Sequence, residues 1–150
     1  MGLKRSKGAT PGFGSTPLTV AARMTRTTDQ SISATTSTVL AMTNTDFVVG
    51  GMVTDTATGK FTVPFDGVYL LSTVLPIHTG GITDFRIRPS VNGSLLDQWI
   101  ARDSINQDRT SGGSILLSLS AGNTVQIEVY GQAAFDIYGA MFPHMALAKL

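Results

Sequence analysis

Residues 59–69 constrain the fold of this chain more than any other stretch, because eleven residues encode a strand, a corner and a second strand. Phe61, Val63 and Phe65 alternate with polar residues or proline, which is the period of a β-strand with one buried face. Pro64 cannot donate to a strand ladder, and an Asp-Gly turn follows it. The first strand must therefore end at this corner, and the chain must re-enter the sheet immediately afterwards.

The second strand of this unit is unusual in its composition. Residues 68–75 are apolar at positions that would face both sides of a sheet. A strand of this kind is covered on both sides. The sequence therefore places it between two layers, or between one layer and a partner subunit.

Two sequence patterns carry a family resemblance. Residues 59–69 follow Gly-x-Phe-x-Val-Pro-x-x-Gly-x-Tyr, and residues 119–127 follow Leu-x-x-Gly-Asp-x-Val-x-Leu with Asn123 at the Asp position. Both resemble the signature of the jelly-roll domain shared by the globular head of complement component 1q and the tumour necrosis factor superfamily. The resemblance implies an all-β antiparallel sandwich of the tumour necrosis factor-like type, and an assembly of three copies around a three-fold axis.

We divide the chain into an N-terminal arm at residues 1–17, a jelly-roll domain at 18–142 and a C-terminal extension at 143–150. The arm is rich in glycine and proline, which break regular structure. The sequence of the extension is compatible with a short helix and with a strap that packs against the domain, and it does not decide between them. The residues expected to pack in the core or in a trimer are Phe61, Tyr69, Leu71, Val125, Ile127, Tyr130 and Tyr138.

The charge of the chain is low and uneven. Charged residues make up 14% of the sequence, the net charge is +1 and there is no cysteine. We therefore expect no nucleic-acid partner and no membrane insertion, and we expect stability to come from packing and oligomerisation rather than disulfides. The arm carries Lys4, Arg5 and Lys7 without any acid, which predicts that it docks on an acidic or groove-shaped surface.

Catalytic and metal-binding patterns are weak. His78 and His144 are the two histidines, and neither has an acid beside it in sequence, so we predict no enzyme and no cofactor. Asp97, Asp103 and Asp108 fall near one segment, but Arg102 and Arg109 are interleaved with them. A solvated loop is favoured there over a calcium site. Three copies of His78 meeting on a three-fold axis remain a remote option for a metal.

The hairpin joined by Asn92-Gly93 raises a second question. Arg86, Arg88 and Trp99 would form an outward basic and aromatic patch if the two strands align them. Such a patch suits a saccharide, a nucleic-acid strand or a protein. The alternative, which the sequence favours, is an ordinary strand face with Trp99 in the core.

Taken with the resemblance, these features predict a homotrimeric virion structural protein of a bacteriophage, in a tail, a fibre or the capsid surface. It would assemble in the host cytoplasm, with other virion proteins as partners, and would be docked by the arm. The second hypothesis is a lectin-like module that binds a host saccharide or protein through loops at 76–84 and 102–113. The residues offered for that site are His78, Asp103, Asp108 and Arg109.

Overall fold

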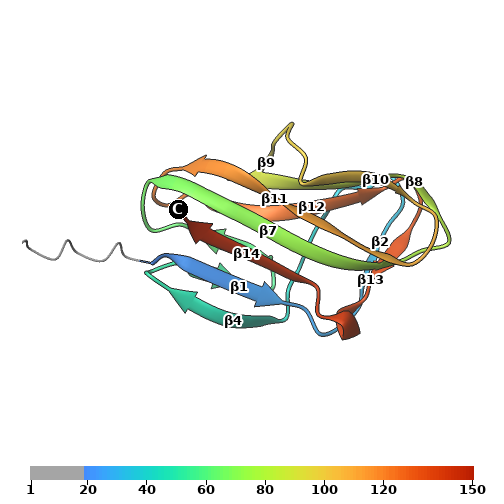
Figure 1. Cartoon of the computed structure of the whole chain (residues 1–150), viewed down its shortest axis with the longest axis horizontal. Helices are drawn as coiled ribbons and strands as arrows, with labels where there is room; N and C mark the ends of the chain where they lie inside the picture. The colour runs from blue at the N-terminus through green and yellow to red at the C-terminus, as the bar shows by residue number, and fades with distance from the viewer. Residues whose placement is uncertain (1–18) are drawn as a thin grey trace, which may run out of the picture.

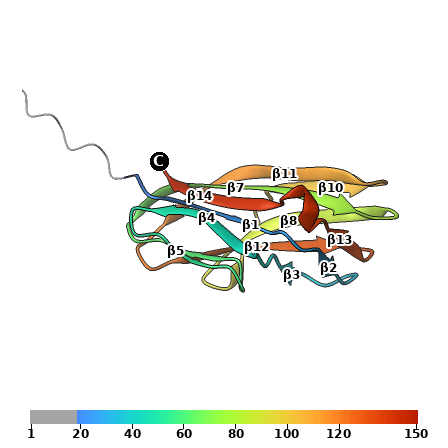
Figure 2. The ribbon, with the colours of Figure 1, turned by 90° about the horizontal axis from the view of Figure 1, so that it is seen from below.

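The protein is a sandwich of two antiparallel sheets, seen in a computed structural model that describes residues 19–150 (Figures 1 and 2). Figure 2 shows the two layers edge-on, with β7, β11 and β14 in one and β12 and β3 in the other. The predicted all-β jelly roll is confirmed. The arm residues Lys4, Arg5 and Lys7 lie outside the described residues.

The first layer, here the β7 sheet, is built around the longest strand. Its members in spatial order are β2 (Gln30–Ile32), β13 (Phe135–Ile137), β7 (Gly67–His78), β14 (His144–Lys149), β1 (Ala21–Thr25) and β4 (Asn44–Val49), with β11 (Arg109–Leu119) also paired to β7.

The second layer, here the β8 sheet, faces it. Its members are β10 (Ala101–Ile105), β8 (Ile82–Val91), β12 (Thr124–Gly131), β6 (Lys60–Thr62) and β5 (Val53–Asp55), with β3 (Thr38–Val39) paired to β12 and β9 (Ser94–Leu95) paired to β8. A short 3₁₀ turn, η1 (Gly139–Met141), precedes β14.

The strand-corner-strand unit forms as the sequence predicts, with β6 before the corner and β7 after it. Gly59 starts the unit in a left-handed conformation (φ 58°), and a Cβ there would lie 1.9 Å from the carbonyl oxygen of Leu40. Only glycine fits such a position. At the other end, the buried Tyr69 hydroxyl donates to the Phe65 carbonyl at 2.8 Å, which ties β7 back to the corner.

The core lies between the two sheets and is made of alternating inward-facing side chains from both. Burial is complete or nearly so for the five residues expected there from the sequence patterns, namely Phe61, Tyr69, Leu71, Val125 and Ile127. The other two residues of that set, Tyr130 and Tyr138, are only partly buried. They lie on outward surfaces that are described below.

The C-terminal segment differs from the division made above. Residues 143–150 are neither a helix nor a strap outside the domain, because β14 lies within the β7 sheet between β7 and β1. Leu147 pairs with Leu71 on one side and Ala22 on the other. Met145 and Leu147 are fully buried. The jelly roll therefore extends through Lys149.

Of the two positions predicted for the strand after the corner, the one between two layers of the same chain is wrong. Within one chain β7 is covered on one side, with Tyr69, Leu71 and Leu75 in the core, whereas Val68 and Val74 are exposed on the other side. The fold of one chain therefore buries only one of the two apolar faces of β7. The other face lies on the surface of the single chain, and its cover by a partner subunit stays a prediction.

Several segments predicted as loops are strands. Most of 102–113 belongs to β10, which pairs with β8, and to β11, which pairs with β7 along eleven positions; only residues 106–108 connect the two strands. Similarly, β7 and β8 take up most of 76–84 and leave 79–81 as the connection. The second strand of the hairpin joined by Asn92-Gly93, expected over residues 95–100, is shorter, since β9 ends at Leu95. Among the described residues no helix is long and apolar enough to span a membrane.

Tyr69 provides a test of this core. Replacing Tyr69 by Ala should lower the free energy of unfolding by about 3 to 5 kcal/mol, because a sandwich cannot close the cavity. Tyr69→Phe keeps the ring and removes only the hydrogen bond to Phe65, so it should cost about 1 kcal/mol. Urea denaturation measures both. Equal stabilities of the two variants would contradict the position of the ring in the core.

Candidate functional site

The candidate site lies at the end of the sandwich opposite Leu150, where β7 meets β8 (Figure 1). β7 ends there at His78, and the short connection 106–108 brings Asp108 beside it. His78 Nδ1 donates to Asp108 Oδ2 at 2.7 Å, and the Thr79 amide donates to Asp108 Oδ1 at 3.0 Å. The His78 ring stacks on Tyr138, with centroids 4.9 Å apart. We call these residues the His78 cluster.

Electrostatics in the His78 cluster follow from these contacts. Hydrogen bonds from His78 and then from the Thr79 amide hold the pKa of Asp108 below its usual value. Burial raises the pKa of the Tyr138 hydroxyl, and the nearby carboxylates of Asp108 and Asp29 raise it further. Asp108 is therefore a carboxylate, and Tyr138 a neutral hydroxyl, at neutral pH.

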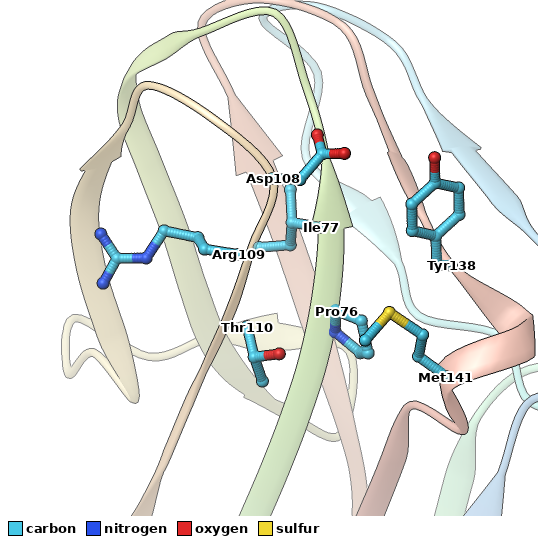
Figure 3. A pocket seen from close by; sticks show the side chains of 7 residues that line it. All are labelled: Pro76, Ile77, Asp108, Arg109, Thr110, Tyr138 and Met141. Atoms are coloured by element: carbon cyan, nitrogen blue, oxygen red, sulfur yellow. The ribbon is translucent and has the colours of Figure 1, made fainter.

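Two hollows flank the cluster. The first has a volume of about 170 Å³, and Figure 3 shows Asp108, Tyr138 and Met141 around it; the full lining is Pro76, Ile77, Asp108, Arg109, Thr110, Tyr138 and Met141. The second, of about 320 Å³, includes His78, Thr79 and Asp136 in its lining. The first is smaller than pockets that hold a whole drug-sized ligand, so it suits one chemical group of a larger molecule.

Of the four residues expected in a ligand site, three line the two hollows, and the fourth, Asp103, contacts one of these three without lining either hollow. His78 and Asp108 are bonded, and Arg109 lines the first hollow with its guanidinium extending away from Tyr138 (Figure 3). Asp103 instead pairs with Arg109 at 2.9 Å. The role of Tyr138 beside His78 was missed, because a stack between β7 and the segment after β13 has no signal in the sequence.

A metal site is not assembled within residues 19–150, since no three potential ligands among His, Cys, Asp and Glu lie close enough there. The carboxylates of Asp103 and Asp108 are each engaged by a cation or a ring nitrogen of their own. The His78 ring makes a hydrogen bond to Asp108 and stacks on Tyr138. Its chemistry is that of hydrogen bonding and stacking.

Arg86, Arg88 and Trp99 do meet on the outer face of the β8 sheet, joined by Arg102 and Tyr130. The placement of Trp99 in the core, which the sequence favours, is wrong, because 36% of its surface is exposed. After the two-residue pairing of β9, residues 96–100 form no strand and contact β8 through the Leu96 and Ile100 amides. Trp99 lies between these two contacts, with its indole against guanidinium groups on the outer face of the sheet.

The comparisons with known proteins agree with this architecture. The C1q domain model matches residues 21–144. The chain belongs to the C1q domain family. No curated protein matches the sequence.

Solved structures similar to this C1q domain are distant in sequence and close in fold. A crystal structure of murine APRIL at pH 8.0 is 13% identical, covers 88% of this chain and 99% of that chain, and has a TM-score of 0.63. The globular domain of zebrafish complement 1qA protein is 16% identical, covers 83% and 94%, and has a TM-score of 0.56. At these identities the likeness shows the jelly-roll fold alone.

The Asp108 contacts of this C1q domain predict an acid titration at one amide. A carboxylate with a lowered pKa stabilises the folded state above the ordinary carboxyl range, and this contribution is lost as the pH falls through the lowered value. The Thr79 amide shift in NMR should therefore titrate with a midpoint below 3.8, the ordinary value for Asp. Asp108→Asn should abolish that titration, and His78→Gln should move its midpoint upward. A midpoint at or above 3.8 in the unmodified protein would exclude the hydrogen-bonded carboxylate.

Proposed function

We propose that this C1q domain is a non-enzymatic homotrimeric module that assembles through the outer face of the β7 sheet. The observation that carries the proposal is the composition of that face. Leu116, Leu70 and Ala148 lie side by side in one row across β11, β7 and β14, and Ser114, Ser72 and Ala146 form the next row. Val68 and Val74 flank these rows on β7 and are 44% and 37% exposed.

Charge is scarce on this face. Arg23 on β1 pairs with Asp46 on β4 at 3.1 Å, at the side of the sheet away from β11. Small and apolar residues in adjacent rows make a flat surface that excludes water well when it is covered. Proteins with C1q and tumour necrosis factor-like domains typically form homotrimers. A second and a third copy of this chain are therefore the partners proposed for this face.

Leu116 offers a direct test of assembly, because it is 57% exposed in the single chain. Leu116→Asp should convert trimers to monomers at micromolar concentration, since each interface would bury an unpaired carboxylate. Light scattering should give about three chains per particle for the unmodified protein. Val53→Asp is the matched control, because Val53 is 60% exposed on the β8 sheet. A trimer that survives Leu116→Asp, or a monomeric unmodified protein, would reject this interface.

The finer proposal is a bacteriophage virion component, in a tail, a fibre or the capsid surface, docked by residues 1–17. It is supported by the arm sequence, in which Lys4, Arg5 and Lys7 occur without any acid. Geometry adds a second argument. The Lys149 amide donates to the Val20 carbonyl, so β1 begins at the end of the sandwich where β14 finishes. An arm attached at this end leaves the His78 cluster at the opposite end, directed away from the particle.

Deletion of residues 1–17 tests the docking proposal. The truncated chain should remain folded and trimeric but should fail to enter virions, because it retains every buried core residue of the described part, from Val20 onward. Replacing Lys4, Arg5 and Lys7 together by Gln should weaken attachment in a salt-dependent manner if charge drives docking. If backbone strand pairing drives it, the triple variant should attach normally. Normal incorporation of the truncated chain would remove the arm as the anchor.

A second function is favoured by one specific observation, the position of the His78 cluster between two hollows. A host saccharide or protein would be bound there through the connections 79–81 and 106–108. Hydroxyl, imidazole and carboxylate groups in one place are suited to hydrogen-bonding a polar ligand. This alternative keeps the homotrimer. It differs from the first proposal because the end of the sandwich that carries the His78 cluster would bind a host ligand.

A further inference from the structure

The outer face of the β8 sheet carries a compact group of cations around one indole. Arg86 and Arg88 project from β8, and Arg102 lies directly opposite Arg86 on β10. The guanidinium carbons of all three lie 5.0 to 5.2 Å from the Trp99 ring centroid. Arg86 also lies 4.9 Å from the ring centroid of Tyr130, its opposite residue on β12. We call these five residues the Arg–Trp patch.

The acids near the patch do not balance its cations. Asp84 accepts from Arg86 and lies 3.4 Å from Arg102, so one carboxylate serves two guanidinium groups. Glu128 lies opposite Arg88 on β12, but its carboxylate accepts from Ser37 at 2.8 Å. Within residues 19–150, Arg88 makes no ion pair and no side-chain hydrogen bond. Arg88 is therefore held by the indole while its donors remain available.

Aromatic contacts offset the repulsion between the cations of the patch. Like charges directly opposite each other on adjacent strands are unfavourable, as for Arg86 and Arg102. A cation over an aromatic face is favourable by about 0.5 to 1 kcal/mol at an exposed site. The Trp99 ring therefore collects three donors whose planar forks suit a carboxylate or a sulfate.

The surroundings of the patch favour a ligand with one anionic group over a polyanion. Asp84 and Glu128 flank the cations, and the whole chain has a net charge of only +1, so a run of phosphates would meet repulsion. At the same time Trp99 keeps 36% of its surface exposed, which offers a flat apolar contact beside Arg88. A sugar ring with a single carboxylate combines these two requirements.

We propose that the Arg–Trp patch binds an acidic saccharide, whose carboxylate pairs with Arg88 and whose ring packs on the exposed part of Trp99. This site is separate from the His78 cluster and lies on the sheet opposite to the proposed trimer face. It stays accessible in the trimer, and three copies on one particle allow multivalent attachment to a polysaccharide.

Trp99 is the single tryptophan of the chain, so its fluorescence reports this patch directly. Methyl glucuronide should change the tryptophan emission in a saturable manner. Methyl glucoside, which lacks the carboxylate, and acetate, which lacks the ring, should each bind at least about tenfold more weakly, because each loses one half of the contact. If acetate binds as tightly as methyl glucuronide, the sugar ring contributes nothing and the proposal of a saccharide ligand is wrong.

Arg88→Gln should weaken methyl glucuronide binding about tenfold, because it removes the charge-assisted bonds. Arg102→Gln is a second variant, in case the first alters the fold, and thermal melting checks both. Lys60→Gln on β6 is the control of equal charge outside the patch, and it should bind as the unmodified protein does. An equal loss in Lys60→Gln would mean unspecific charge attraction and would overturn the site.

Two further probes distinguish the class of partner. A single-stranded oligonucleotide and an oligoglutamate peptide should each bind more weakly than methyl glucuronide at matched salt. Tighter binding of either one would reject an acidic saccharide in favour of a nucleic acid or an acidic protein. Light scattering on Arg88→Gln separates this test from the assembly proposal, because the variant should remain trimeric while losing the fluorescence response.

Discussion

The pairing of β7 with β11 on one side and with β14 and β13 on the other is the constraint on which the rest of the structure depends. The twelve residues of β7 direct their side chains alternately into the core and toward the outer face of the sheet. Tyr69, Leu71 and Leu75 fill the core, while Leu70 and Val74 face outward. Because side chains alternate along a strand, a register shift of one residue would exchange the two sets. The same register carries His78 to the end of the sandwich beside Asp108.

Local patterns were sufficient to predict many of the short strands, since period-two alternation and turn dipeptides depend on neighbours in sequence. The jelly roll itself was predicted from the resemblance of two motifs, at residues 59–69 and 119–127. Non-local strands were predicted less well. β14 contains alanines and a lysine of low strand propensity, and its place between β7 and β1 supplies the strand conformation. The sequence held one signal, because the large apolar side chains of Met145 and Leu147 alternate with small or polar residues. Likewise the Ser-Gly-Gly-Ser run of β11 reads as a loop, and only its pairing with β7 makes it a strand.

For the candidate sites too, the sequence predicted individual residues but not the contacts that depend on strands far apart in the chain. His78, Asp108 and Arg109 could be selected because polar and titratable residues were expected at connections, but the bond between His78 and Asp108 depends on Arg109 pairing opposite Ile77. Trp99 was assigned to the core on its hydrophobicity. An indole that collects three guanidinium groups gains from cation–π contact at the surface, and this gain cannot be read from the segment around Trp99 alone.

The two sheets of the sandwich differ in charge, and this difference separates their roles. Aliphatic and small side chains dominate the outer face of the β7 sheet around Leu70 and Leu116, whereas cations and aromatic rings gather on the outer face of the β8 sheet. Two full layers of side chains, with buried Leu71 and Ile87 among them, lie between these faces. Substitutions on opposite faces should therefore add independently in their effects on stability. A chain with so few charges can then be apolar enough to assemble and still keep one charged surface for recognition.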